Sequence, residues 1–133
     1  MIGLIMYLSL FAIAAGAALG AIMRWLLGIS LNTLHSGLPY GTLLANWIGA
    51  YLIGLFSALC IHFTQIAPEW RLFVITGFLG GLTTFSTFSL EAVQMLLSQR
   101  YTLAVTHILL HTGGSLLLTI LGLVTVHWWL KAG

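Results

Sequence analysis

Polar side chains gather at one place inside the long apolar stretches of this sequence, between residues 77 and 91. The segment reads GFLGGLTTFSTFSLE and combines three glycines, a run of hydroxyls, two phenylalanines and a carboxylate. Placed on a helix, Thr84, Thr87, Phe88 and Glu91 share one face. If this segment crosses a membrane, the ionisable Glu91 is by default a functional group. The alternative is that Glu91 lies close enough to the end of its helix to be solvated.

The glycines of this segment predict an interruption of the helix. Gly77, Gly80 and Gly81 make an uninterrupted helix costly, and Thr83 or Thr84 can cap a helix that restarts after the break. Non-helical backbone at membrane depth survives only when it is buried in protein or lines a wet cavity. A break therefore favours an ion or substrate site near the bilayer midplane. The alternative is a kinked helix whose glycines pack closely against a neighbouring helix.

Other polar groups lie in the apolar stretches before and after this segment. Asn46 can donate an amide hydrogen to an anion or join two helices by hydrogen bonds. His107, His111, Ser115 and Thr119 recur every four residues and form a drifting polar stripe. The two histidines could bind a metal, but the sequence offers no third ligand nearby. We expect the stripe to face the bundle interior, as a hydrogen-bonded seam or as a permeation track.

The elements that carry these residues are membrane helices. The chain has 133 residues, of which 60% are hydrophobic and only 5% charged, and no soluble domain of this size can bury so much apolar surface. The net charge of +2 gives no indication of nucleic-acid binding. Stretches of about 20 apolar residues predict an all-α domain over residues 1–133, with four spans at about 2–27, 41–63, 70–97 and 102–130.

The first span carries the pair Gly16 and Gly20 among alanines, a spacing that lets two helices approach closely. Arg24 follows near the end of this span. We expect its side chain to reach the membrane interface; at a pore mouth, or vestibule, it would also attract anions.

The basic residues are divided equally between the two sides of the membrane. Four spans put Arg71 and Lys131 on one side and Arg24 and Arg100 on the other. Orientation follows the bias in Lys and Arg, and here that bias is zero. The expected consequence is dual topology, with two oppositely oriented copies forming an antiparallel homodimer, the separate-chain equivalent of an inverted repeat.

Three classes of membrane protein can be compared on these features. An ion channel or transporter fits the broken helix, the polar stripe and the dual topology. An enzyme is not expected, because the spans contain no Asp or Lys and no HExxH or GxSxG motif. A purely structural subunit leaves the break unexplained. Small multidrug exporters, the alternative transporter, also have four helices and dual topology, but they are organised around a carboxylate in the first helix, and this first span has none.

The sequence resembles the Fluc (CrcB) family of bacterial fluoride channels. The resemblance is carried by GAALGAIMRW in the first span, GTLLANWIGAYLIG in the second and GFLGGLTTFSTFSLE in the third. The fourth span matches more loosely. The resemblance implies a fluoride-selective channel in the bacterial inner membrane that exports fluoride passively, assembled as an antiparallel homodimer with two pores.

The resemblance also assigns roles to particular residues. Backbone carbonyls of Gly80 and Thr83, from both subunits, would hold a central structural sodium ion. Asn46, Phe85 and Phe88 would line the pore, and positive ring edges suit an anion. The remaining polar residues of the expected pore are Ser86, Thr87, Glu91, His111, Ser115 and Thr119.

Overall fold

The computed structural model describes residues 2–33 and 37–132, all of its regular structure being helical. Four helical stretches are long and apolar enough to cross a membrane. They are α1 (Ile2–Leu31), α2 (Tyr40–His62), a segmented third span and α6 (Tyr101–Ala132). The predicted all-α architecture with four membrane-spanning helices is confirmed.

The third span consists of four helical pieces. These are α3 (Pro68–Arg71), the wider π-helical turns η1 (Leu72–Leu79), α4 (Gly80–Leu82) and α5 (Phe85–Leu97). Helix α1 continues past Gly28 to Leu31, because one glycine among apolar residues costs a helix only about 1 kcal/mol. The other ends lie within two residues of the expected ones.

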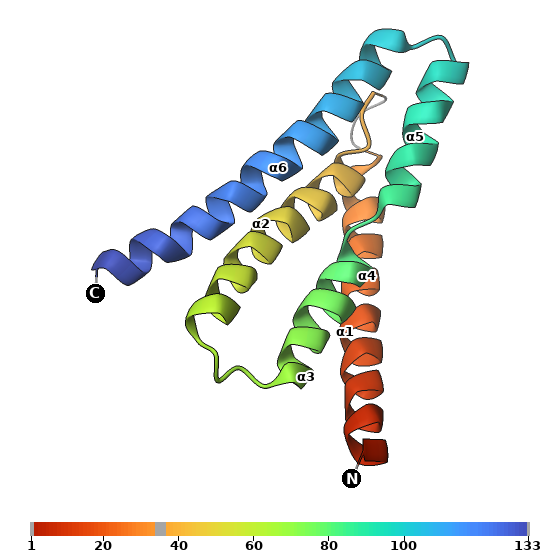
Figure 1. Ribbon diagram of the computed structural model, residues 1–133. Helices are drawn as coiled ribbons and strands as arrows, with labels where there is room; N and C mark the ends of the chain where they lie inside the picture. The colour runs from red at the N-terminus through yellow and green to blue at the C-terminus, as the bar shows by residue number, and fades with distance from the viewer. Residues whose placement is uncertain (1, 34–36, 133) are drawn as a thin grey trace.

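The spans pack in two pairs. Helix α2 lies along α6, and α1 lies along η1 and α4 (Figure 1). The two termini and the α2–α3 connection are at one end of the bundle, and the α5–α6 connection is at the other. Successive spans therefore run in alternating directions, as was assumed when the basic residues were assigned to the two sides of the membrane.

Glycines bring α1 and the third span into backbone contact. A Cβ added at Gly77 would lie 2.7 Å from the Ile13 carbonyl oxygen, and one at Gly16 would lie 2.8 Å from the Phe78 nitrogen. Gly20 and Gly81 are equally closed, against the carbonyl oxygens of Phe78 and Ala17. These glycines therefore serve close helix packing. Gly80 differs, since the nearest atom to its added Cβ is 3.8 Å away.

The helix break lies at two threonines that follow the glycines. Gly77, Gly80 and Gly81 are helical, whereas Thr83 (ψ 154°) and Thr84 (ψ 118°) are extended. Thr84 caps α5, with its Oγ1 accepting from the Thr87 amide at 3.1 Å. Of the two caps predicted, Thr84 is therefore the one used, while the Thr83 hydroxyl donates to the Leu79 carbonyl.

Candidate functional site

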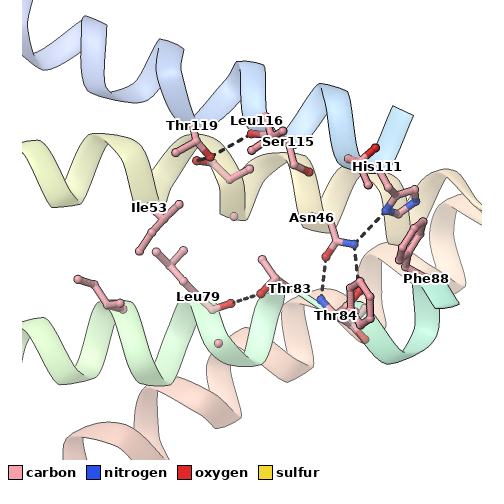
Figure 2. Close-up of a pocket in the computed structure, with 16 residues that line it drawn as sticks. Asn46, Ile53, Leu79, Thr83, Thr84, Phe88, His111, Ser115, Leu116 and Thr119 are labelled. Carbon is pink, nitrogen blue, oxygen red and sulfur yellow. Dashed lines mark hydrogen bonds between the residues drawn. The ribbon is translucent and has the colours of Figure 1, made fainter. Parts of the chain in front are cut away.

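Asn46 of α2 satisfies the backbone that the break exposes. Its Oδ1 accepts from the Thr84 amide at 2.7 Å, and its Nδ2 donates to the Thr84 carbonyl at 3.1 Å (Figure 2). The second Nδ2 hydrogen points to His111 Nδ1, also at 3.1 Å. Both amide hydrogens thus have acceptors, so in this conformation Asn46 joins three helical pieces instead of offering a spare donor.

The break also frees backbone carbonyls from their helical partners. In a continuous helix the Thr84 amide would bond to the Gly80 carbonyl, but it donates to Asn46 instead. In the same way the Thr87 amide turns from the Thr83 carbonyl to Thr84 Oγ1. The Gly81 carbonyl, which would have accepted from Phe85, accepts from Arg24 Nε at 3.0 Å. Arg24 is therefore half-buried, with its guanidinium directed at the break.

An open groove of about 620 Å³ runs along one side of the break. It lies between α2, the third span and α6 (Figure 2). Eight of the predicted site residues line it: Asn46, Gly80, Thr83, Phe85, Phe88, His111, Ser115 and Thr119. The Thr119 hydroxyl donates to the carbonyls of Ala50 and Ser115, both at 3.0 Å, so this part of the polar stripe is a hydrogen-bonded seam between α2 and α6.

The two phenylalanines differ in exposure. Phe88 is 8% exposed, whereas Phe85 is 78% exposed at the groove. The Phe88 ring stacks on two histidines of α6, with centroid distances of 5.3 Å to His107 and 4.7 Å to His111. The Phe85 ring tilts against Phe88 at 5.6 Å. Phe88 therefore closes the end of the groove where the titratable residues begin.

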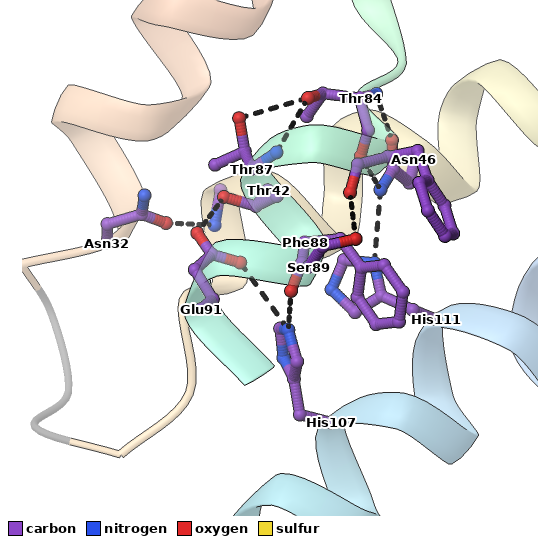
Figure 3. A network of polar contacts seen from close by, with 12 residues as sticks. Asn32, Thr42, Asn46, Thr84, Thr87, Phe88, Ser89, Glu91, His107 and His111 are labelled. Atoms are coloured by element: carbon purple, nitrogen blue, oxygen red, sulfur yellow. Dashed lines mark hydrogen bonds and ion pairs between the residues drawn. The ribbon is translucent and has the colours of Figure 1, made fainter. Parts of the chain in front are cut away.

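Glu91 lies beyond Phe88 and contacts two other helices. Its Oε1 accepts from the Thr42 hydroxyl of α2 at 2.6 Å, and its Oε2 lies 3.5 Å from His107 Nε2 (Figure 3). The Glu91 side chain is 15% exposed and that of His107 only 1%. Glu91 is thus fixed inside the bundle, which argues against a freely solvated position at the end of its helix.

A second pocket, of about 540 Å³, adjoins Glu91 on the other side. Polar residues line much of it, among them Asn32, Gln94, Ser98 and Arg100. Glu91 therefore lines this polar pocket, while its neighbour Phe88 lines the groove. Together, the two pockets and the residues between them form a line of polar and aromatic groups through the chain.

Besides Arg24, two expected residues lie apart from this line. Ser86 and Thr87 cluster around Thr84, with Ser86 Oγ at 3.3 Å and Thr87 Oγ1 at 3.0 Å from Thr84 Oγ1. The described linings of both pockets leave them out.

A carboxylate stands beside the two histidines, where the sequence offered no third metal ligand. One ligand atom from each of Glu91, His107 and His111 lies within 4.8 Å of the others.

Thr42 was not singled out in the sequence, and His107 was placed in the polar stripe but not among the pore residues. Each stands four residues before a predicted site residue, Asn46 and His111 respectively, and so lies on the same helix face. That spacing was the available signal. Thr42 gave little other indication, because a lone hydroxyl in a membrane helix is common at packing contacts.

These observations define a multi-pass membrane protein with a polar line between two pockets, and the comparisons identify its family. The family model described as "CrcB-like protein, Camphor Resistance (CrcB)" matches residues 11–123. The chain belongs to this CrcB family, as its sequence motifs predicted.

Relatives in three bacteria carry the name "Fluoride-specific ion channel FluC". The protein of Chromohalobacter salexigens is 60% identical over 120 residues, covering 90% of this chain and 91% of the relative. That of Pseudomonas aeruginosa is 55% identical over 125 residues, covering 94% and 98%. That of Paraburkholderia xenovorans is 56% identical over 121 residues, covering 91% and 96%.

Proposed function

We propose that this chain is a fluoride-selective channel that lets fluoride leave the cell passively across the bacterial inner membrane. The observation that carries the proposal is the line of groups from the polar pocket through Glu91, the two histidines and Phe88 to the groove. Membership in the CrcB family and the printed names of the relatives supply the identity of the ion.

The aromatic part of this line suits a small anion. Ring edges carry the positive part of the aromatic quadrupole, so the edges of Phe85 and Phe88 attract an anion without competing for hydrogen bonds. A weak contact of this kind also lets the ion leave, which conduction requires. Ser115, and the hydroxyl oxygen of Thr119, continue the polar lining beyond the rings.

The open groove supports assembly of two chains. Asn46, Thr83, Thr84, Ser115 and Thr119 line it, and polar groups facing lipid are costly. A second copy that covers the groove removes this cost and completes the wall around each line of polar groups. With a zero bias in basic residues, the partner is an antiparallel copy of the same chain, and the dimer has two pores.

The break also fits a structural sodium ion at the dimer axis. Sodium prefers oxygen ligands, as hard cations do, and the carbonyls of Gly80 and Thr83 have lost their helical donors to Asn46 and Thr84. Both residues line the groove. Each chain would supply these two carbonyls, and the bound cation would lower the cost of bringing an anion into the bilayer.

The features that favour a channel weigh against the alternatives. A small multidrug exporter needs a carboxylate in the first helix, and the two acidic residues of this chain, Glu69 and Glu91, are both in the third span. The relatives are named as channels, which is consistent with a protein that is not an enzyme.

Growth of a fluoride-sensitive bacterium that lacks its own fluoride exporter tests the proposal. Expression of this chain should restore growth in fluoride medium, whereas equal expression of the Phe88→Ile variant should not. Failure of the membrane-inserted wild-type chain to restore growth would contradict a fluoride-export function.

A further inference from the structure

Three titratable side chains meet between the two pockets. One carboxylate oxygen of Glu91 and one ring nitrogen each of His107 and His111 all lie within 4.8 Å of one another. Two atoms of this cluster, Glu91 Oε2 and His111 Nε2, are buried without a hydrogen-bond partner. Figure 3 shows the three side chains converging from α5 and α6. Buried polar atoms without partners are rare, so a bound species belongs between them.

The proton on His111 can be placed from its neighbours. The Thr84 backbone fixes the Asn46 amide, because Oδ1 must face the Thr84 N–H and Nδ2 must face the Thr84 carbonyl. Nδ2 therefore donates to His111 Nδ1, which must accept. In a neutral imidazole the other nitrogen then carries the hydrogen. His111 consequently presents an unpartnered Nε2–H donor inside the cluster, although it is only 4% exposed.

His107 is a donor for a similar reason. Its Nε2 lies 3.4 Å from the Phe88 carbonyl oxygen and 3.5 Å from Glu91 Oε2. Both neighbours are acceptors when Glu91 is ionised, so Nε2 carries the hydrogen. The two contacts are long, which leaves this donor able to turn toward a closer acceptor.

This placement of protons disfavours a metal ion. A metal bound to His111 Nε2 would need the hydrogen on Nδ1, where it would face the amide hydrogen of Asn46. Asn46 cannot turn its oxygen to Nδ1 without losing both bonds to Thr84. An anion, in contrast, needs the donors that His107 and His111 already present.

The ionised carboxylate is the remaining obstacle to an anion. Like charges at this separation repel strongly in a poorly solvated interior. Protonation of Glu91 at Oε2 removes the repulsion and supplies a third donor, while Oε1 keeps its bond from Thr42. Three atoms within 4.8 Å of one another can all lie about 2.8 Å from one central point, an ordinary hydrogen-bond length.

We propose that Glu91, His107 and His111 form one anion site that takes up a proton from solvent together with the anion. The inference rests on the proposed function for the identity of the anion, fluoride. The other polar side chains that contact the cluster in the described part of the chain are Thr42 and Asn46 of α2, which do not titrate. Arg100 lines the adjoining polar pocket with Glu91.

Fluoride binding and proton uptake, measured together on the purified protein, test this inference. Sodium fluoride is titrated calorimetrically between about pH 5.5 and about pH 8.5, with proton uptake followed in weakly buffered solution. Above the pH at which the free cluster loses its proton, one proton should enter with each fluoride and the affinity should fall about tenfold per pH unit. The Glu91→Gln variant carries a permanent amide donor, so its affinity should not depend on pH and no proton should enter.

The chain offers a matched control in Glu69→Gln, which removes the only other carboxylate side chain and should leave proton uptake intact. Fluoride binding without proton uptake in the wild-type protein, or undiminished uptake in Glu91→Gln, would overturn the inference while leaving the channel proposal standing. Absence of both fluoride binding and fluoride efflux at every pH would overturn the two together. Nitrogen NMR of the wild-type histidines adds a test that needs no variant: a hydrogen on His111 Nδ1 instead of Nε2 would also contradict it.

Discussion

At the scale of single residues, Asn46 depends on having both an acceptor and a donor. In Asn46→Asp the oxygen facing the Thr84 amide remains, but the donors to the Thr84 carbonyl and to His111 are replaced by a second acceptor. We expect a loss of about 2–6 kcal/mol in stability, since each of the two groups left without a donor costs about 1–3 kcal/mol, together with impaired fluoride efflux. Thermal unfolding in detergent measures the first effect.

Asn32→Asp is the matched control for this substitution. Asn32 uses its Oδ1 to accept from the Gly41 amide at 2.7 Å, and an aspartate keeps that acceptor. Its unfolding temperature should stay close to that of the wild-type protein. Equal destabilisation by the two substitutions would show that the donors of Asn46 contribute nothing.

The two phenylalanines distinguish a pore role from simple packing. Isoleucine is bulky and apolar but has no quadrupole, so Phe85→Ile and Phe88→Ile should each fold and lose about tenfold or more in fluoride efflux. Phe11→Ile is the control for Phe85, since the two rings are 74% and 78% exposed, and it should transport normally. Wild-type efflux in both pore variants would return these rings to the core.

Residue types alone identified much of this site. Asn46, Glu91 and His111 are conspicuous because polar groups are expensive in a membrane helix. Their contacts were not predictable in the same way. The hydrogen bond from Thr42 to Glu91 and the two hydrogen bonds between Asn46 and Thr84 depend on how α2 is rotated against the third span. The spacing of polar residues in one helix does not specify that rotation.

At the scale of elements, Gly77 and Gly81 of the third span serve packing against α1, and the helix break lies at other residues. The sequence predicted the number of spans because the count of long apolar stretches decides it. It predicted a break near the glycines, but their close backbone contacts are with α1, and the extended residues are the two threonines that follow. Glycine is typical both of close helix packing and of helix breaks, so the residue type alone could not distinguish the two.

This division predicts different outcomes for two glycine-to-alanine changes. In Gly81→Ala the new methyl group meets the Ala17 carbonyl, and overpacking of this kind costs about 1–3 kcal/mol. In Gly113→Ala it meets no atom within 4 Å, and the higher helix propensity should stabilise α6 by up to about 1 kcal/mol. Unfolding in detergent compares them, and equal stability of the two variants would contradict the assigned packing.

At the scale of the whole molecule, the basic residues are divided equally between the two sides and so favour neither orientation in the membrane. Because the bias in basic residues is zero, a reporter fused after Gly133 should be found on both sides of the membrane. Two lysines added beside Arg100 should shift the population toward one orientation. Two lysines added beside Lys131 should shift it the other way, and a reporter found on one side only in the unmodified protein would exclude an antiparallel dimer.

Anion efflux from liposomes that hold the purified protein tests the central claim most directly. Vesicles loaded with potassium fluoride or potassium chloride are compared at equal protein content, with a potassium ionophore to balance charge. The proposed channel should release fluoride rapidly and passively, retain chloride at the rate of protein-free vesicles, and lose fluoride release in Phe88→Ile. Equal release of both anions, or fluoride release no faster than from empty vesicles, would contradict a fluoride-selective channel.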